Sequence, residues 1–195
     1  MPSENTVLRN ELKARRLALD TYAVHNASAA IIAKLWGLPE LARFQSIAVY
    51  MAANGEINCD PFIRQGWRRK KKIYVPVLRN SRMLFSRLTS KSKLRENRFG
   101  IPEPDGSSSS LLAAAKLDCI IAPLVAFDLA GTRLGMGGGY YDRSLHFSLA
   151  QRGWRHPLLI GTAFDFQRVE HIQRQPWDVP LHCVVTEKSI YRFSR

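Results

Sequence analysis

Two patterns of apolar and polar positions recur along the chain, and together they predict its fold. Six short apolar runs are typical of buried strands: residues 46–51, 72–77, 83–88, 117–127, 158–164 and 182–187. Three stretches with apolar residues at helical spacing predict helices: residues 4–19, 22–36 and 140–151. Because strands alternate with helices, the pattern predicts an α/β fold in which helices cover both faces of a mainly parallel sheet.

Residues that favour caps and turns mark the ends of these elements. Ser3 is a suitable N-cap for the first helix, and Asp60-Pro61 predicts the start of another helix with Asp60 as its N-cap. The segment 105–110, DGSSSS, is expected to be a flexible turn rather than a linker, because the composition does not change across it. We therefore expect one domain over residues 1–195, with a frayed tail from residue 189.

The composition is typical of a globular protein from a reducing compartment. Hydrophobic residues make up 46% of the 195 positions. No apolar run approaches the ~20 residues that span a bilayer. The N-terminus is polar and lacks the apolar segment of a signal peptide, and the three cysteines are far apart. These features predict a cytoplasmic protein with no membrane partner and no cysteine metal site.

The stretch from Gly131 to Arg143, GTRLGMGGGYYDR, carries the strongest chemical signal. It has four glycines between Gly135 and Gly139, where side chains would keep a ligand from the backbone or forbid a positive φ. A strand, a glycine-rich loop and a helix in that order point backbone N–H groups at a phosphate, and Arg133 adds a cation. A plain tight turn is the alternative, because the loop has neither Walker nor GxGxxG spacing.

The run RLGMGGGYYDR resembles the signature of the 5-formyltetrahydrofolate cyclo-ligase family, also called methenyltetrahydrofolate synthetases, and the resemblance covers nearly the whole chain. It implies an enzyme that uses ATP and Mg²⁺ to close the 5-formyl group of 5-formyltetrahydrofolate onto N10. The implied products are 5,10-methenyltetrahydrofolate, ADP and phosphate. The implied fold is a three-layer α/β/α domain similar to sugar-phosphate isomerases and CoA transferases.

The resemblance implies two groups of ATP-binding residues. The family has Lys-x-x-Leu-Arg near its N-terminus, where Arg9 matches the arginine and Asn5 stands in place of the lysine. Lys13 is a candidate substitute for that lysine, although basic residues on this helix also fit an ordinary solvated face. The second group lies in the loop: Arg133, Leu134, Gly135, Met136, Gly137, Gly138, Gly139, Tyr140 and Tyr141.

The resemblance also implies four folate-binding residues: Met51, Glu56, Phe99 and Tyr140. Glu56 is expected just beyond the carboxyl end of a strand, where open α/β sheets bind ligands, although many loop glutamates are only solvated. Phe99 belongs to the segment RFGIPEP, which resembles the family's fgIPEP, and a core aromatic below a loop is its alternative.

The implied chemistry assigns catalytic roles to Arg133 and Glu56 and a metal site to Asp142 and Asp178. Phosphoryl transfer requires mainly positioning and charge neutralisation, which Arg133 and Mg²⁺ would supply, while Glu56 would orient the folate. Taken without the resemblance, Asp178 lies near two prolines and is typical of a turn.

The net charge of +13, from 29 Lys and Arg against 16 Asp and Glu, leaves other classes of function open. Such a charge attracts polyanions, among them nucleic acid, ATP and polyglutamylated folate, although a solvated basic surface needs no partner. No helix-turn-helix, zinc-finger or RNP-type aromatic motif is present, so we expect a small-molecule substrate, no nucleic-acid partner and a monomer. The rivals are a nucleic-acid-binding protein and a phosphotransferase with another small acceptor.

Overall fold

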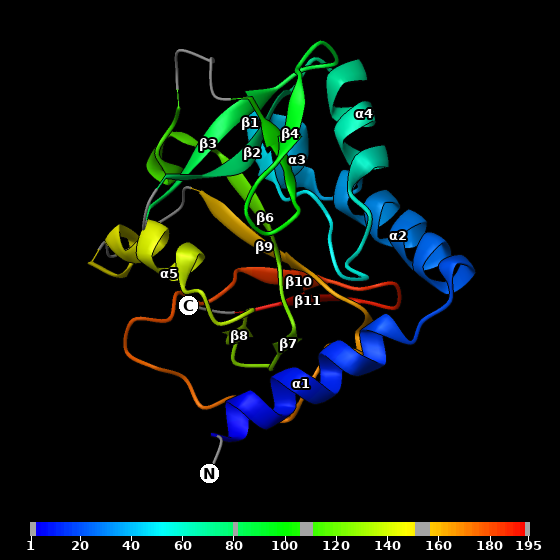
Figure 1. Cartoon of the computed structure of the whole chain (residues 1–195), viewed down its shortest axis with the longest axis vertical. Coiled ribbons are helices and arrows are strands. Elements are labelled where there is room, and N and C mark those ends of the chain that lie inside the picture. The colour runs from blue at the N-terminus through cyan, green and yellow to red at the C-terminus, as the bar shows by residue number, and fades with distance from the viewer. Residues whose placement is uncertain (1–2, 80–81, 106–110, 151–156, 194–195) are drawn as a thin grey trace.

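A seven-stranded sheet in the order β11-β10-β9-β6-β1-β2-β3 forms the centre of the molecule (Figure 1). The computed structural model describes residues 3–79, 82–105, 111–150 and 157–193. The inner strands are parallel: β1 (Ser46–Val49), β2 (Lys72–Arg79), β6 (Cys119–Pro123), β9 (Leu158–Thr162) and β10 (Cys183–Val185). The edge strands β3 (Arg82–Leu88) and β11 (Ile190–Arg192) pair antiparallel. The mainly parallel α/β sheet predicted from the sequence is confirmed.

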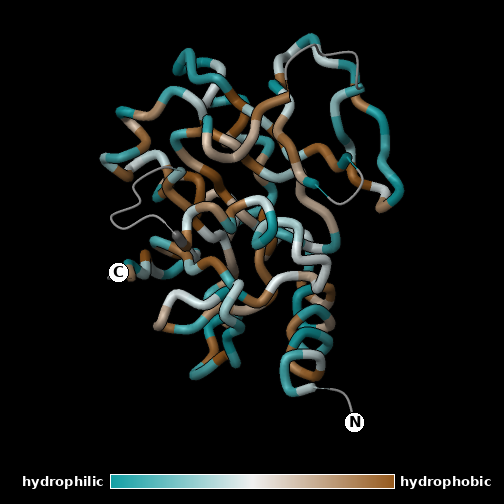
Figure 2. Tube along the Cα trace, turned by 90° about the vertical axis from the view of Figure 1, so that its left-hand side faces the viewer, coloured by the Kyte–Doolittle hydropathy of each residue, from teal (hydrophilic) through white to brown (hydrophobic). Residues whose placement is uncertain are grey.

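Two apolar layers bury the faces of this sheet, which lies in the hydrophobic interior (Figure 2). Ile47 and Val49 of β1 face one layer and Ala48 faces the other, as the alternating geometry of a strand requires. The first layer is built on α2 (Thr21–Trp36), α3 (Pro39–Arg43) and α4 (Asp60–Arg68). The second includes α5 (Tyr140–Leu145) and the 3-10 turn η1 (Ala114–Lys116). The predicted covering of both faces is therefore present.

The remaining elements of the described residues are helix α1, two β-hairpins and two 3-10 turns. Helix α1 (Glu4–Leu17) packs through Leu12 on the hairpin of β7 (Ala126–Phe127) and β8 (Arg133–Leu134). A second hairpin, β4 (Leu94–Glu96) with β5 (Pro102–Pro104), contacts β2 and β3 through β5. Two 3-10 turns complete the chain: η2 (His146–Ala150) and η3 (Asp165–Gln167).

The strand order reverses between β1 and β6, and this reversal determines where a ligand can bind. After β1 the chain adds β2 on one side, and after β6 it adds β9 and β10 on the other. The connections therefore diverge at the carboxyl ends of β1 and β6 and leave a crevice there. Residues that follow Val49 and Pro123 line that crevice, described below.

Two predicted elements are shorter than expected. The strand predicted over 117–127 ends at Pro123, because the carbonyl of Leu124 leaves the sheet and accepts hydrogen bonds from Arg16 and Gln167. The helix predicted over 140–151 is α-helical only to Leu145 and continues as η2; residue 151 lies outside the described residues. The predicted turn at 105–110 also falls almost entirely outside them.

The tail and two helix caps differ from the predictions. Residues 190–192 form β11, held by Tyr191 against Phe127 with ring centroids 5.3 Å apart and by a 2.7 Å ion pair between Arg192 and Glu40. The predicted frayed tail is therefore wrong for this segment. Asp60 is the first residue of α4 rather than its N-cap. Ser3 occupies the N-cap position of α1, but its side chain makes no capping hydrogen bond.

Candidate active site

A cavity of about 1010 Å³ opens at the crevice between β1 and β6. Its wall takes Met51 and Glu56 from beyond β1, Leu124 from beyond β6, and further residues from α1, the glycine loop and the β4–β5 hairpin. Except for the candidate Lys13, every position that the sequence analysis assigned to ATP, folate or metal lines this one cavity: Arg9, Met51, Glu56, Phe99, Arg133, Leu134, Gly135, Met136, Gly137, Gly138, Gly139, Tyr140, Tyr141, Asp142 and Asp178.

Helix α1 supplies one arginine to the cavity and keeps its lysine outside. The Arg9 Nε atom donates a 2.9 Å hydrogen bond to the carbonyl of Gly135, which ties α1 to the glycine loop. Asn5 also lines the cavity, and its Nδ2 atom donates to the carbonyl of Gln173 at 3.1 Å. Lys13 is not among the lining residues. The structure therefore gives no support to Lys13 as a substitute for a lysine at position 5.

The glycine loop adopts a backbone that requires glycine at two positions. Gly137 and Gly139 have φ values of +97° and +63°, in the region that L side chains rarely adopt. Within the described residues, the backbone N–H groups of residues 135–139 donate no hydrogen bond to another part of the protein. These donors are therefore free to bind an anion. Because α5 has only 6 residues, its helix dipole contributes less to anion binding here than the loop amides and arginines do.

Arg133 is a buried cation with one nitrogen paired and one unpaired. Its side chain is 3% exposed, and its Nη2 atom pairs with Asp142 Oδ1 at 2.5 Å. The other terminal nitrogen, Nη1, is buried without a hydrogen-bond partner among the described residues. A buried donor without a partner is costly, so this atom is suited to an oxygen of a bound anion. The guanidinium also lies 5.5 Å from the ring centroid of Tyr141.

The two predicted metal ligands lie on adjoining segments. Asp142 Oδ1 also accepts a 3.3 Å hydrogen bond from the backbone of Val179, the residue that follows Asp178. Asp178 Oδ2 accepts a 2.8 Å bond from the backbone of Gln175, which is the turn that its sequence context indicated. Among the described residues, no cluster of three or more His, Cys, Asp or Glu side chains is placed to hold a metal.

Glu56 is presented by a tight turn and faces a buried arginine. Asn54 and Gly55 both have positive φ, at 51° and 72°, and Glu56 accepts a 3.1 Å hydrogen bond from the backbone of Ala53. Burial raises the pKa of Glu56, and the Ala53 hydrogen bond and the charge of Arg16 oppose that shift. Arg16 Nη2 lies 3.9 Å from Glu56 Oε1. A carboxylate so placed can accept hydrogen bonds from a planar nitrogen heterocycle.

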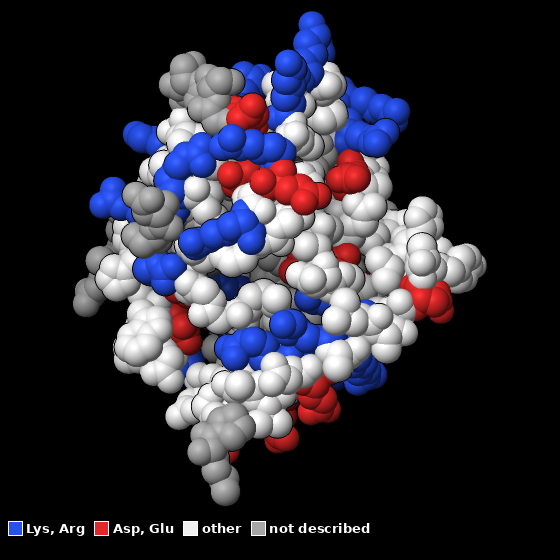
Figure 3. Space-filling view, viewed as in Figure 1, with Lys and Arg blue, Asp and Glu red and all other residues white. Residues whose placement is uncertain are grey.

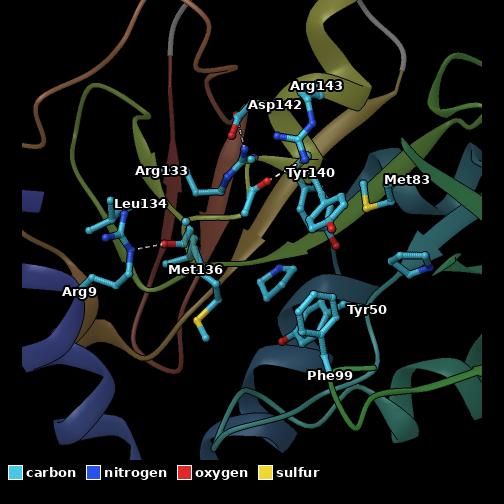
Figure 4. Close-up of a pocket in the computed structure, with 18 of the residues that line it drawn as sticks. Arg9, Tyr50, Met83, Phe99, Arg133, Leu134, Met136, Tyr140, Asp142 and Arg143 are labelled. Atoms are coloured by element: carbon cyan, nitrogen blue, oxygen red, sulfur yellow. Dashed lines mark hydrogen bonds and ion pairs between the residues drawn. The ribbon is translucent and has the colours of Figure 1, made fainter. Parts of the chain in front are cut away.

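The half of the cavity opposite Arg133 is apolar and aromatic (Figure 4). Phe99 is 54% exposed on the β4–β5 hairpin and lies across from Tyr140. Tyr50 and Met83 also line this part of the cavity. Other apolar residues that line the cavity include Met51, Pro76, Leu78 and Ile101. The cavity thus joins a cationic half with free amide donors to a half suited to a flat ring system.

The match to known proteins agrees with this arrangement. The model of the 5-formyltetrahydrofolate cyclo-ligase family matches residues 2–187.

The chain belongs to this family.

Relatives of known name match over almost the full length of the chain. The cyclo-ligase of Escherichia coli (strain K12) is 35% identical over 187 residues, covering 93% of this chain and all of the relative. That of Haemophilus influenzae is 35% identical, covering 89% of this chain and 92% of the relative. An NMR structure of Aquifex aeolicus 5,10-methenyltetrahydrofolate synthetase has a TM-score of 0.85 and 31% identity, covering 99% of this chain and 94% of that one.

Sequence reasoning missed two residues that line this cyclo-ligase cavity, Tyr50 and Met83, and a buried arginine behind its wall, Arg16. Tyr50 and Met83 were assigned only to apolar strand runs, and periodicity cannot tell a cavity wall from a packed core. Arg16 is one of the basic residues of α1 for which a solvated face was the alternative, but it is only 2% exposed. It donates hydrogen bonds to the carbonyls of Asn54 at 3.0 Å and Leu124 at 3.3 Å. Arg9 and Arg16 are seven residues apart, which puts both side chains on the same side of α1. This spacing was the signal that could have placed both on the side of the helix that faces the protein.

Proposed function

We propose that the protein catalyses the ATP-dependent cyclisation of 5-formyltetrahydrofolate to 5,10-methenyltetrahydrofolate, with release of ADP and phosphate. One observation carries the proposal: a single cavity joins the glycine loop and Arg133 to an aromatic wall with Glu56 at its edge. Family membership supports the same reaction. No described helix is both long and apolar enough to cross a membrane.

The chemistry requires the two substrates to meet within this cavity. An N-formyl oxygen is a poor leaving group, so it attacks the γ-phosphorus of ATP and displaces ADP, which leaves a phosphorylated iminium at N5. N10 then adds to that carbon, its proton is lost, and phosphate departs with the C–O bonding pair. The ring closure is intramolecular, so it gains its rate from proximity. The protein must therefore mainly align the substrates and neutralise phosphate charge.

The residues of the loop half fit the phosphate-binding role. Arg133 Nη1 would donate to a phosphate oxygen while Nη2 stays bound to Asp142, and this pairing fixes the guanidinium plane. Arg9 would add a second cation, held by its bond to Gly135. The free amides of residues 135–139 would bind the remaining oxygens.

The donor set also fits Mg²⁺ as a third participant. Mg²⁺ is usually held by one or two carboxylates together with substrate phosphates and water rather than by a protein cage. Asp142 and Asp178 lie on adjoining segments of the cavity wall and would be those carboxylates. The ion would neutralise charge on the transferred phosphate. We further propose a cytoplasmic monomer, supported by three buried free cysteines and by a cavity built from one chain.

A direct assay tests the proposed function. Purified protein with 5-formyltetrahydrofolate should produce the methenyl chromophore only when ATP and Mg²⁺ are both present, and chelation of the metal should stop product formation. ATP hydrolysis without methenyl product, on this acceptor or another, would favour a phosphotransferase. Tight duplex DNA binding at physiological salt with no methenyl product would favour a nucleic-acid-binding protein.

Glu56→Gln is expected to weaken folate binding about tenfold or more and leave nucleotide affinity within about twofold, since loss of a charged hydrogen bond costs roughly 1.5–3 kcal/mol. Glutamine keeps the shape and can still accept the Ala53 hydrogen bond, so the fold should hold. Equilibrium titrations with each substrate measure the effect, and Glu170→Gln, at an exposed position, is the control. A variant that loses ATP affinity and keeps folate affinity contradicts the role given to Glu56.

A further inference from the structure

A side-chain hydrogen bond joins the β4–β5 hairpin to the residue that follows the glycine loop. Arg98, at the tip of the hairpin, donates from Nη2 to the hydroxyl of Tyr140 at 2.6 Å. Tyr140 directly follows Gly139 and starts α5. Phe99 and Tyr140 face the same space from these two elements (Figure 4). The contact therefore joins the aromatic wall of the cavity to its phosphate-binding half.

The tip of the hairpin holds Arg98 and Phe99 in a fixed relation. Asn97 Oδ1 accepts hydrogen bonds from the backbones of Phe99 at 2.9 Å and Ile101 at 3.2 Å, and Gly100 completes the turn with a φ of +70°. The Arg98 guanidinium lies 4.8 Å from the centroid of the Phe99 ring. A displacement of Arg98 is therefore transmitted to the ring that faces the cavity.

The other partner, Tyr140, is held just as closely to the glycine loop. Arg143 places its guanidinium 4.9 Å from the Tyr140 ring centroid and donates from Nη2 to the carbonyl of Gly138 at 2.7 Å. An anion that orders residues 137–139 would thereby order the Tyr140 side chain as well. On the face that Figure 3 shows, Lys and Arg are scattered among Asp and Glu and do not gather in one basic patch.

We propose that Arg98 is a positioning residue that couples the two substrates through Tyr140. The inference rests on the proposed function, because it takes the nucleotide to the loop and the folate to the Phe99 wall. Each substrate orders its own side of the Arg98–Tyr140 contact, so the second to bind meets a site that is already ordered. By linkage, each substrate then raises the affinity for the other by the same factor.

The coupling factor is the quantity to measure. We expect the parent protein to bind 5-formyltetrahydrofolate about fivefold or more tightly in the presence of a saturating, non-hydrolysable ATP analogue with Mg²⁺. Arg98→Ala should reduce that factor below about twofold, with folate affinity in the absence of nucleotide changed little. Arg98→Lys keeps the charge but not the planar fork, and it should recover part of the coupling.

Two controls separate coupling from a general effect on the hairpin. Arg95→Ala removes from the same hairpin a 62% exposed arginine, which forms an ion pair with Asp105 at 3.4 Å. It should keep the parental coupling factor. Tyr140→Phe removes only the hydroxyl, so Arg98→Ala should cause no further loss of coupling when added to it.

The outcomes of these experiments separate the proposed function from the proposed role of Arg98. If the parent forms no methenyl product, the proposed function fails. If the parent is active but shows no coupling, or if Arg98→Ala keeps the coupling factor, the proposed role of Arg98 is wrong and the function stands. An equal loss in Arg95→Ala also overturns it, because the effect would then belong to the hairpin as a whole.

Discussion

Arg133→Lys is expected to lower kcat/KM about 10³-fold, the scale on which an arginine contributes to phosphoryl transfer. The guanidinium of Arg133 can serve two partners at once, since Nη2 pairs with Asp142 and Nη1 has no hydrogen-bond partner among the described residues. A lysine ammonium is a compact charge and cannot donate the two coplanar hydrogen bonds that a guanidinium can. The substitution therefore keeps the charge and removes the geometry.

The fold should tolerate this change better than a neutral substitution. Lysine can still neutralise Asp142, whereas removing the cation would leave a carboxylate without its ion-pair partner. Steady-state kinetics with both substrates varied, together with thermal melting, measure the two effects. Arg87→Lys, at an exposed position on β3, should change neither. An Arg133→Lys variant that melts like the parent and keeps more than about a tenth of its kcat/KM would exclude the bidentate role.

The sequence could predict those parts of the site whose residues lie close together along the chain. The glycines, Arg133 and Asp142 lie within thirteen positions, and a glycine-dense loop after a buried strand has few structural solutions. The strand and helix pattern likewise placed Glu56 beyond the carboxyl end of β1. Local spacing and the period of each element were sufficient for both.

The features that could not be predicted depend on contacts between distant segments. Arg16 is charged and lies on a helix, so its sequence context favours a solvent-exposed side chain. In the structure its guanidinium is instead buried and donates hydrogen bonds to the carbonyls of Asn54 and Leu124. Nothing near residue 190 indicates a strand either, because β11 exists through pairing with β10 and the Arg192–Glu40 ion pair. Hydrophobic periodicity predicts which side of a helix or strand is apolar. It does not predict which backbone carbonyls accept hydrogen bonds from a buried cation.

Gly137→Ala is expected to reduce turnover about 10²-fold, comparable to the loss of an anion-stabilising donor, while the melting temperature changes little. Gly137 has a φ of +97°, where an L residue is strained by roughly 1–3 kcal/mol. The loop is exposed at this position and can relieve the strain by changing shape. That relief would turn the amides of residues 137–139 away from the phosphates, so the cost falls on catalysis rather than stability.

Gly135→Ala is the matched comparison within the same loop. Gly135 has no positive φ, and a Cβ added there meets no atom within 4 Å, so the backbone can keep its shape. Its loss of turnover should therefore be far smaller than that of Gly137→Ala. Nucleotide titrations should show the same order, because the defect lies in phosphate contacts and not in the folate wall. Equal losses in the two variants would mean that the loop excludes any side chain, and that the left-handed backbone at Gly137 does not set the phosphate site.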